Sequence, residues 1–317
     1  MKVTFLFALM LGAGIAGSAT AQSIGVGTMS QGTMSYSTGS AIAKVITEKA
    51  KVQARVQPNT GETVLIPLIN TGELNFGISN VMEAADAVTG QGAFNGRKLP
   101  DLRLSNVLYP LKTGIFVRKD SPIKTIADLK GKRLSYGYTA TASVRIILDG
   151  ILANGGLTPA DIRPVLVPNV ARGAEEFASG NADAFFFAVG AAKVTEVDAQ
   201  VSGLRMLPIS TEAGPTAAMR KIFPYGYAIE VKPRPGLAGI VQPTAAMSYD
   251  NVLLVSVKEK DDDVYKVVKA IAENKADLVS SFAPFNDFDV AQMHKPNMPV
   301  AFHPGALRYY KERGLVK

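Results

Sequence analysis

The chain has 317 residues, of which 47% are apolar and 19% charged, and a formal net charge of +7. This balance excludes a disordered chain and is typical of a globular protein with a sizeable core. The sequence contains no cysteine, which excludes disulfides, thiolate metal ligands and a cysteine nucleophile. Its lysines and arginines are scattered and lack interleaved aromatic residues, so we expect no nucleic acid partner.

The N-terminal stretch predicts export. Lys2 precedes the apolar run "FLFALMLGAGIAG", and the following "SATAQS" places Ala19 and Ala21 at the small-residue positions of a cleavage site. The run is too short and too rich in glycine to form a stable membrane span. We therefore predict a signal peptide over residues 1–21, cleaved after Ala21, and a periplasmic mature chain.

Short apolar segments alternate with helical patterns through most of the remaining chain, which predicts an α/β fold. The predicted strands cover residues 23–28, 52–57, 74–79, 103–108, 113–118, 132–137, 164–168, 183–188, 204–209, 227–231 and 251–257.

Two helices are predicted by a buried stripe. One begins near Ser143, with apolar residues at Val144, Ile147, Leu148, Ile151 and Leu152. The other begins at 261–263, where three aspartates complement the helix dipole, and buries Val264, Val267, Val268 and Ile271. A third segment, "ETVLIPLINTG", contains Pro67, so we expect a kinked or shortened helix there.

The even alternation, without a flexible linker, predicts two interwoven lobes. The chain is expected to leave the first lobe near "LYPLKTG" at 108–114 and to return near "MSYDN" at 247–251. This gives a first lobe of residues 22–109 and 247–317 and a second lobe of residues 110–246.

Small hydroxyl and amide residues recur where predicted strands lead into helices. In an open α/β sheet these loops converge at the carboxyl ends of the strands, where helix N-termini offer free N–H groups to a small anion. The candidate ligand-binding residues are Thr28, Ser30, Thr33, Tyr36, Thr60, Ser79, Asn80, Tyr138, Thr139, Thr141, Ser143, Phe187 and Tyr225.

Several of these residues have an equally simple structural interpretation. Asn80 and one residue of the 139–143 stretch fit helix N-caps. Phe187 belongs to a run that fits a fully buried strand, and Tyr225 fits either a cleft or the core. Arg118, Arg145 and Arg172 stand near strand or helix ends, where a guanidinium group can pair with a ligand carboxylate. The alternative is that all three are ordinary surface residues.

Enzymatic patterns are absent from the sequence. His294 and His303 match no metal-ligand spacing, and neither a nucleophile elbow nor a phosphate-binding loop occurs. The predicted cleft loops offer only Glu62 as an acid, which equips them poorly for acid–base catalysis. We expect a non-enzymatic protein with no metal and no cofactor.

The order of several blocks resembles the TAXI class of substrate-binding proteins that serve TRAP-type transporters. The blocks are "IGVGTMSQGTMSYSTGSAIAKVI", "NTGETVLIPLINTGELNFGISN", "LYPLKTGIFVRKDSPIKTIADLKGKRLSYG", "GNADAFFFAVGA", "NVLLVSVKEKDDDVYKVVKAI" and "FHPGALRYYKERGL". The resemblance implies two Rossmann-like lobes of the type II periplasmic binding protein kind, a cleft between them, and a small carboxylate ligand such as an acidic amino acid or a dicarboxylate. The chain departs from that pattern at "YTATAS", at "QGT" and at Asn80.

These observations lead to a functional hypothesis: a monomeric, exported receptor that binds a small organic anion and delivers it to the membrane components of a TRAP transporter. The alternatives are a ligand-sensing subunit of a signalling receptor and a periplasmic enzyme that acts on a small carboxylate. Acidic side chains in the wall of the cleft would contradict an anionic ligand.

Overall fold

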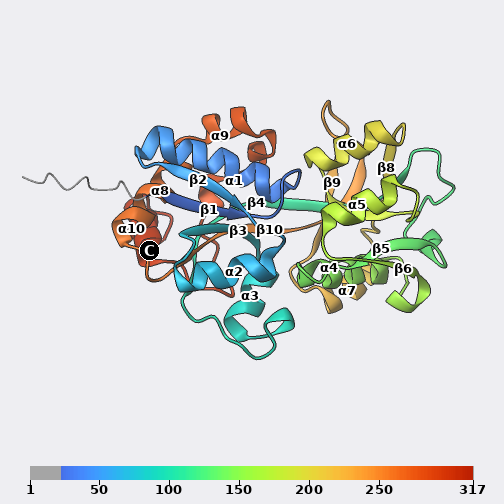
Figure 1. The fold of residues 1–317 in the computed structure, drawn as a ribbon, viewed down its shortest axis with the longest axis horizontal. Helices are drawn as coiled ribbons and strands as arrows, with labels where there is room; N and C mark the ends of the chain where they lie inside the picture. The colour runs from blue at the N-terminus through green and yellow to red at the C-terminus, as the bar shows by residue number, and fades with distance from the viewer. Residues whose placement is uncertain (1–22, 317) are drawn as a thin grey trace, which may run out of the picture.

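The computed structural model describes residues 23–316, so the predicted signal peptide lies outside the described residues. Figure 1 shows two α/β lobes side by side, joined by two long strands, β4 (Leu102–Arg118) and β10 (Thr244–Ser256). The predicted fold class, α/β with two lobes and crossing segments, is confirmed. The predicted lobe boundaries fall inside these two strands and stay a prediction.

The first lobe holds the first three strands and the C-terminal helices (Figure 1). Its strands are β1 (Ile24–Thr28), β2 (Ala54–Pro58) and β3 (Phe76–Asn80). Its helices and helical turns are α1 (Met34–Val45), η1 (Ile46–Ala50), α2 (Glu62–Thr71), α3 (Val81–Thr89), η2 (Gly92–Phe94), α8 (Asp261–Glu273), α9 (Lys275–Ser281), η5 (Ala283–Asp287), η6 (Val290–Gln292) and α10 (Pro304–Glu312).

The second lobe is built from the middle of the chain (Figure 1). Its strands are β5 (Arg133–Gly137), β6 (Arg163–Val167), β7 (Phe185–Ala188), β8 (Leu204–Met206) and β9 (Tyr227–Val231). Its helices and helical turns are η3 (Ala127–Leu129), α4 (Ala142–Asn154), η4 (Pro159–Asp161), α5 (Val170–Ala178), α6 (Ala192–Gln200) and α7 (Ala213–Ile222).

One sheet runs through both lobes, in the order β2-β1-β3-β10-β4-β7, with β8 also paired to β4 and β9 to β10. β1 is parallel to β2 and β3, so the carboxyl ends of these strands share one edge of the sheet. The loops that follow this edge reach the second lobe, because the N–H of Thr63 donates to the carbonyl of Ala140 at 3.3 Å. The helix N-termini of both lobes therefore meet between the lobes.

The two strands predicted at 103–108 and 113–118 are one continuous strand, β4. β4 contains Pro110, although proline cannot donate to a sheet ladder. The strand passes Pro110 opposite Asp250 of β10, and the register shifts between Asp250 and Val252. A β-bulge thus accommodates the proline, and β4 carries the chain across without a loop.

The predicted helical patterns hold, with one difference. The α4 stripe from Val144 to Leu152 and the α8 stripe from Val264 to Ile271 are buried. The helix predicted to be kinked or shortened at Pro67 is not shortened, since α2 runs from Glu62 to Thr71. Leu65, Ile66 and Ile69 are fully buried, and each such side chain contributes about 1.5 to 3 kcal/mol, which offsets the hydrogen bond that Pro67 cannot make.

Among residues 23–316, no helix combines the length and the apolar character that crossing a bilayer requires. The same residues contain no group of three or more histidine, aspartate or glutamate side chains arranged to hold a metal ion. His303 instead caps α10, accepting a hydrogen bond from the N–H of Gly305 at 3.1 Å. His294 packs on Phe302, with ring centroids 4.5 Å apart.

Candidate functional site

A cavity of about 50 Å³ lies between the lobes, at the ends of β1, β3 and β7. The first lobe contributes Met29, Thr33, Met34, Ser35, Glu62 and Ile78 to its wall. The crossing strands β4 and β10 contribute Leu111, Thr113, Tyr249 and Asn251. The second lobe contributes Val144, Val170, Phe186, Phe187 and Ala188. Side chains from both lobes and both connections thus surround one space, as in binding sites at the edge of an α/β sheet.

A larger hollow, of about 280 Å³, lies beside the crossing strands on the outside of this cavity. Its wall includes Lys112, Lys232 and Arg234 as well as Glu230 and Asp287, and Lys112 pairs with Asp287 at 2.7 Å. Apart from Met34, which both walls share, no described residue of β1, β3 or the loops that follow them lines this hollow. We therefore take the inner cavity as the candidate site, because the helix N-termini converge there.

A buried carboxylate cluster, Glu62, Asn80, Glu83 and Ser143, lies next to the cavity and joins three helix N-termini. The carboxylate of Glu62 accepts hydrogen bonds from the backbone N–H of Asn80 at 3.1 Å and from its Nδ2 at 2.7 Å. Asn80 Nδ2 also donates to Ser143 Oγ at 3.0 Å. Glu83 Oε2 accepts from the N–H of Ser143 at 2.9 Å, so a carboxylate of the first lobe caps α4 of the second.

The two carboxyl groups of this cluster are nearly inaccessible to water, with Glu62 4% and Glu83 1% exposed. Burial raises the pKa of Glu62 well above its usual range, and the charge of Glu83 adds to that rise. Burial also raises the pKa of Glu83, against hydrogen bonds from Ser143 that lower it. Within residues 23–316, neither carboxylate forms an ion pair with a lysine or an arginine.

The lobes are in direct contact around the cavity. Thr141 Oγ1 donates to Met29 Sδ at 3.8 Å, and the N–H of Lys193 donates to the carbonyl of Gly32 at 3.1 Å. Gly61 lies so close to the second lobe that a Cβ at this position would be 1.9 Å from the carbonyl oxygen of Ala140. The arrangement is therefore a closed one, which requires glycine at position 61.

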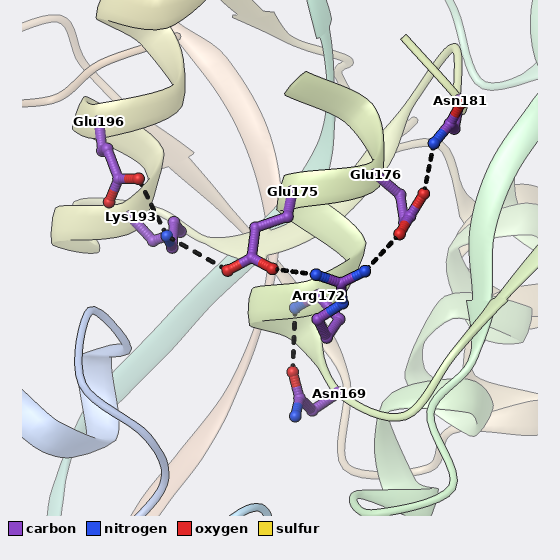
Figure 2. A network of polar contacts seen from close by, with 7 residues as sticks. All are labelled: Asn169, Arg172, Glu175, Glu176, Asn181, Lys193 and Glu196. Atoms are coloured by element: carbon purple, nitrogen blue, oxygen red, sulfur yellow. Dashed lines mark hydrogen bonds and ion pairs between the residues drawn. The ribbon is translucent and has the colours of Figure 1, made fainter. Parts of the chain in front are cut away.

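An exposed rim network lies on α5 and α6 of the second lobe (Figure 2). Arg172 donates to Glu175 at 2.7 Å and to Glu176 at 2.6 Å, and Lys193 pairs with Glu196 at 3.0 Å. The members of the rim network are Asn169, Arg172, Glu175, Glu176, Asn181, Lys193 and Glu196. Arg172, one of the three arginines considered for pairing with a ligand carboxylate, is therefore already paired with two glutamates of the protein.

The other two arginines also have local partners. Arg118 lies over the ring of Phe177, 5.6 Å from its centroid. Arg145 lies 3.8 Å from Asp149, four residues along α4. None of the three arginines is part of the cavity wall.

Five of the predicted site residues belong to the cavity wall, to the buried carboxylate cluster or to the contacts between the lobes. Thr33 and Phe187 are part of its wall. Asn80 and Ser143 belong to the buried carboxylate cluster, and Thr141 contacts Met29, a wall residue. Three of these five also have a structural role. Thr33 and Asn80 cap α1 and α3, and Phe187 is a fully buried strand residue.

The remaining predicted residues lie outside the cavity wall, which comprises described residues only. Thr28 is buried and donates to the carbonyl of Met29, while Tyr138 is buried and donates to the carbonyl of Ser135. The rest are the buried Ser79, the half-buried Ser30, Tyr36 and Tyr225, and the exposed Thr60 and Thr139. Their role in ligand binding stays a prediction.

Sequence reasoning missed Glu83, which lies in α3 and outside the cavity wall, as a second buried acid beside Glu62. Glu83 stands three residues after Asn80, in the spacing of a helix cap followed by an acid in the first turn. That spacing was the available signal. Met29, Met34, Tyr249 and Asn251 carried no comparable signal, because an apolar or amide residue in a loop or strand has no distinctive spacing.

The solved structures that resemble this chain confirm its architecture. PhnD1 from Prochlorococcus marinus, in complex with methylphosphonate, is 10% identical with a TM-score of 0.58, over 93% of this chain and 99% of that one. A structure described as a periplasmic transporter is 14% identical with a TM-score of 0.57, over 94% of this chain and 95% of that one. The fold is that of two-lobed type II periplasmic binding proteins.

A third similar structure is the amino acid ABC transporter substrate-binding protein AbpA from Streptococcus pneumoniae, bound to L-arginine. It is 12% identical with a TM-score of 0.51, over 86% of this chain and 97% of that one. At such low identities these similarities establish the fold and leave the ligand of this chain open.

The resemblance to the TAXI class of TRAP transporters is wrong. The quoted blocks lie at strand-to-helix junctions and in the crossing strands, so they reflect the two-lobed fold, which several families share. The model of a different family, the NMT1-like family, matches residues 26–314, and the proteins of similar structure include an ABC transporter component. The chain therefore belongs to the NMT1-like family.

Proposed function

We propose that this chain is an exported solute-binding protein that captures a small solute between its lobes and delivers it to the membrane components of an ABC-type importer. The observation that carries this proposal is the enclosed cavity, whose wall combines residues of both lobes and both crossing strands. A solute held there contacts both lobes at once. Its binding energy therefore favours the closed arrangement, which is the shape that a transporter distinguishes from the open one.

The fold and the predicted signal peptide support this role. PhnD1 and AbpA, which share the fold, are described with methylphosphonate and L-arginine respectively. Export of residues 22–317 by the predicted signal would place the protein in the periplasm, where such receptors meet their solutes. β4 and β10 cross between the lobes, so bending of these two strands opens and closes the site (Figure 1).

We do not extend the proposal to a carboxylate ligand. The cavity wall contains the carboxylate of Glu62 and neither lysine nor arginine among its described residues. In their ionised forms Glu62 and Glu83 would repel an anion, and the low dielectric of a buried site would strengthen that repulsion. The sequence-based expectation of an anionic ligand therefore stays a prediction, which the residues of this wall do not support.

A thermal-shift panel of small solutes tests the proposal. The panel contains amines, amino acids, carboxylates, phosphonates and sugars, each added to the purified mature chain. A solute at 100 times its dissociation constant adds about 2.7 kcal/mol of stability, which raises the melting temperature by several degrees. We expect at least one solute to produce this rise.

The position of binding is checked with a cavity-filling variant. Ala188→Leu places a larger side chain into the cavity wall and should abolish the rise. The control Ala217→Leu makes the same change at an exposed position of α7 and should leave the rise intact. If no solute of the panel stabilises the wild-type chain, the proposed function is wrong.

A further inference from the structure

The ionised form of Glu62 has hydrogen bonds but no counter-charge. Both of its oxygens accept from Asn80, at 3.1 and 2.7 Å, and the side chain lies in the cavity wall. A buried carboxylate without a cationic partner is costly to keep charged. No lysine or arginine of the described chain supplies that partner, so a positive group that enters the cavity would.

Side chains of the protein already accept hydrogen bonds at three of the helix starts where an anion would bind. Glu83 accepts the N–H of Ser143 at the start of α4. Thr33 accepts the N–H of Tyr36 at the start of α1, and Asn80 accepts the N–H of Glu83 at the start of α3. One free N–H group at each of these three helix starts is therefore already bound by a side chain of the protein itself, which leaves fewer donors for a ligand anion.

Apart from Thr33, Ser35, Thr113 and Asn251, the rest of the wall fits an apolar body. Met29, Met34, Ile78, Val144 and Val170 surround the space, and the rings of Phe186, Phe187 and Tyr249 add aromatic surface. Aromatic rings attract cations as well as apolar groups. A volume of about 50 Å³ in the closed arrangement admits only a few non-hydrogen atoms.

From these contacts we infer that the solute is a small amine with one positive charge and a short apolar body, and that Glu62 selects for its ammonium group. This inference rests on the proposed function and names the ligand class of the same cavity. The ammonium group donates to the carboxylate of Glu62, and the apolar body packs against the methionine, valine and phenylalanine side chains. Selectivity arises because the corresponding alcohol lacks the charge and the corresponding acid carries the opposite one.

Matched ligands test the charge. Isobutylamine, isobutanol and isovalerate share one apolar body and differ in charge, and methylamine, propylamine and cyclohexylamine with their alcohol and acid counterparts vary the body. Isothermal titration calorimetry at pH 8 measures each dissociation constant. We expect at least one amine to bind about tenfold or more tightly than its alcohol and its acid, as a charge-assisted hydrogen bond predicts.

A variant pair tests the residue. Glu62→Gln should weaken the best amine about tenfold or more and leave its alcohol within about twofold. Glu48→Gln removes an exposed carboxylate of the same lobe and should change neither constant. If Glu62→Gln does not fold, amine affinity of the wild type from pH 8 to pH 5 is the substitute measurement. The affinity for the amine should fall as Glu62 takes up its proton. The titratable groups that act on Glu62 or lie against it are Glu83 on α3 and Tyr249 on β10.

The inference is overturned if no amine binds more tightly than its alcohol, or if Glu62→Gln leaves amine binding unchanged. In that case a thermal shift with a carboxylate, phosphonate or sugar would show that the proposed function still holds with a different ligand class. Absence of any shift across the whole panel would remove the proposed function as well. The two failures are therefore distinguishable.

Discussion

The rim network and the buried carboxylate cluster both lie where the lobes meet, and they differ in whether their charged side chains have partners of opposite charge. In the rim network Arg172 is paired with Glu175 and Glu176, and its side chain is 54% exposed. In the buried carboxylate cluster Glu62 and Glu83 are removed from water and have no cation among the described residues. Exposed pairs contribute about 0 to 1 kcal/mol, whereas an uncompensated buried charge costs several kcal/mol.

This difference indicates which charges serve function. The rim network is complete in itself, because each of its charged side chains has an opposite partner (Figure 2). In the buried carboxylate cluster the carboxylates of Glu62 and Glu83 accept hydrogen bonds, but no cationic side chain of the described residues balances their charge. Such an imbalance in a cavity wall is expected at a binding site, where the ligand supplies the missing charge.

The largest expected effect comes from Gly61→Ala, which prevents the two lobes from coming together. The new Cβ would lie 1.9 Å from the carbonyl oxygen of Ala140, so the closed arrangement is excluded while each lobe remains able to fold. Overpacking of this kind costs about 3 kcal/mol, so affinity for the best solute of the panel should fall about 100-fold. Calorimetry measures the affinity, and small-angle scattering measures the separation of the lobes.

Gly214→Ala is the control for this prediction. Gly214 lies in α7 and has open space around the position of a Cβ, so the substitution should alter neither affinity nor lobe separation. Unchanged affinity in Gly61→Ala would mean that solute binding does not need the closed arrangement.

A pair of asparagines gives a direct comparison of the two regions, with a smaller expected effect. Asn80 and Asn169 both cap a helix, accepting from Glu83 N–H and Arg172 N–H respectively. Asn169→Ala should cost about 1 kcal/mol, the usual value of a cap. Asn80→Ala should cost about 2 to 4 kcal/mol, because it also removes the donors to buried Glu62 and Ser143.

Urea denaturation measures both unfolding free energies. Equal losses in the two variants would mean that the hydrogen bonds of the buried carboxylate cluster add nothing beyond a helix cap. The comparison between the buried and exposed regions would then no longer hold.

The pH dependence sharpens the same comparison. Burial raises the pKa of both Glu62 and Glu83, so the folded chain holds these protons more tightly than the unfolded chain. Stability is therefore lost as the pH rises from the ordinary glutamate pKa toward the raised values. We expect Glu83→Gln to reduce this loss between pH 5 and pH 8, measured as unfolding free energy by urea denaturation.

Arg172→Ala serves as the matched change in the rim network and is the smallest expected effect. It should alter the unfolding free energy by no more than about 1 kcal/mol at either pH, because its pairs are exposed. If Glu83→Gln and Arg172→Ala showed the same pH profile, the two carboxyl groups would not titrate as buried groups.

Much of the fold was predictable from local patterns. The α4 and α8 stripes, the β9 strand at 227–231 and the buried run from Phe185 to Phe187 follow from periodicities of 3.6 and 2 residues and from unbroken apolar runs. The continuity of β4 through Pro110 was not predictable, because the bulge that allows it depends on the partner strand β10. The helix through Pro67 depends in the same way on burial against the sheet.

The binding site shows a sharper division. Thr33, Asn80, Thr141, Ser143 and Phe187 were proposed because strand ends and helix starts leave a local signature, and their role in ligand binding stays a prediction. Their neighbours in space were not found. Glu83 caps a helix that begins 60 positions later, and Tyr249 reaches the cavity from a strand that returns from the other lobe.

The sequence by itself determined most of the strands and helices, because each depends on side chains within a few positions of one another. Only the tertiary structure decided which groups satisfy which helix N-termini across the lobes, since that depends on how two separately folded bodies meet. A glutamate of the first lobe occupies the start of α4 that the sequence offered to an anion. Which N–H groups stay free between the lobes therefore follows from docking of the lobes and not from any local pattern.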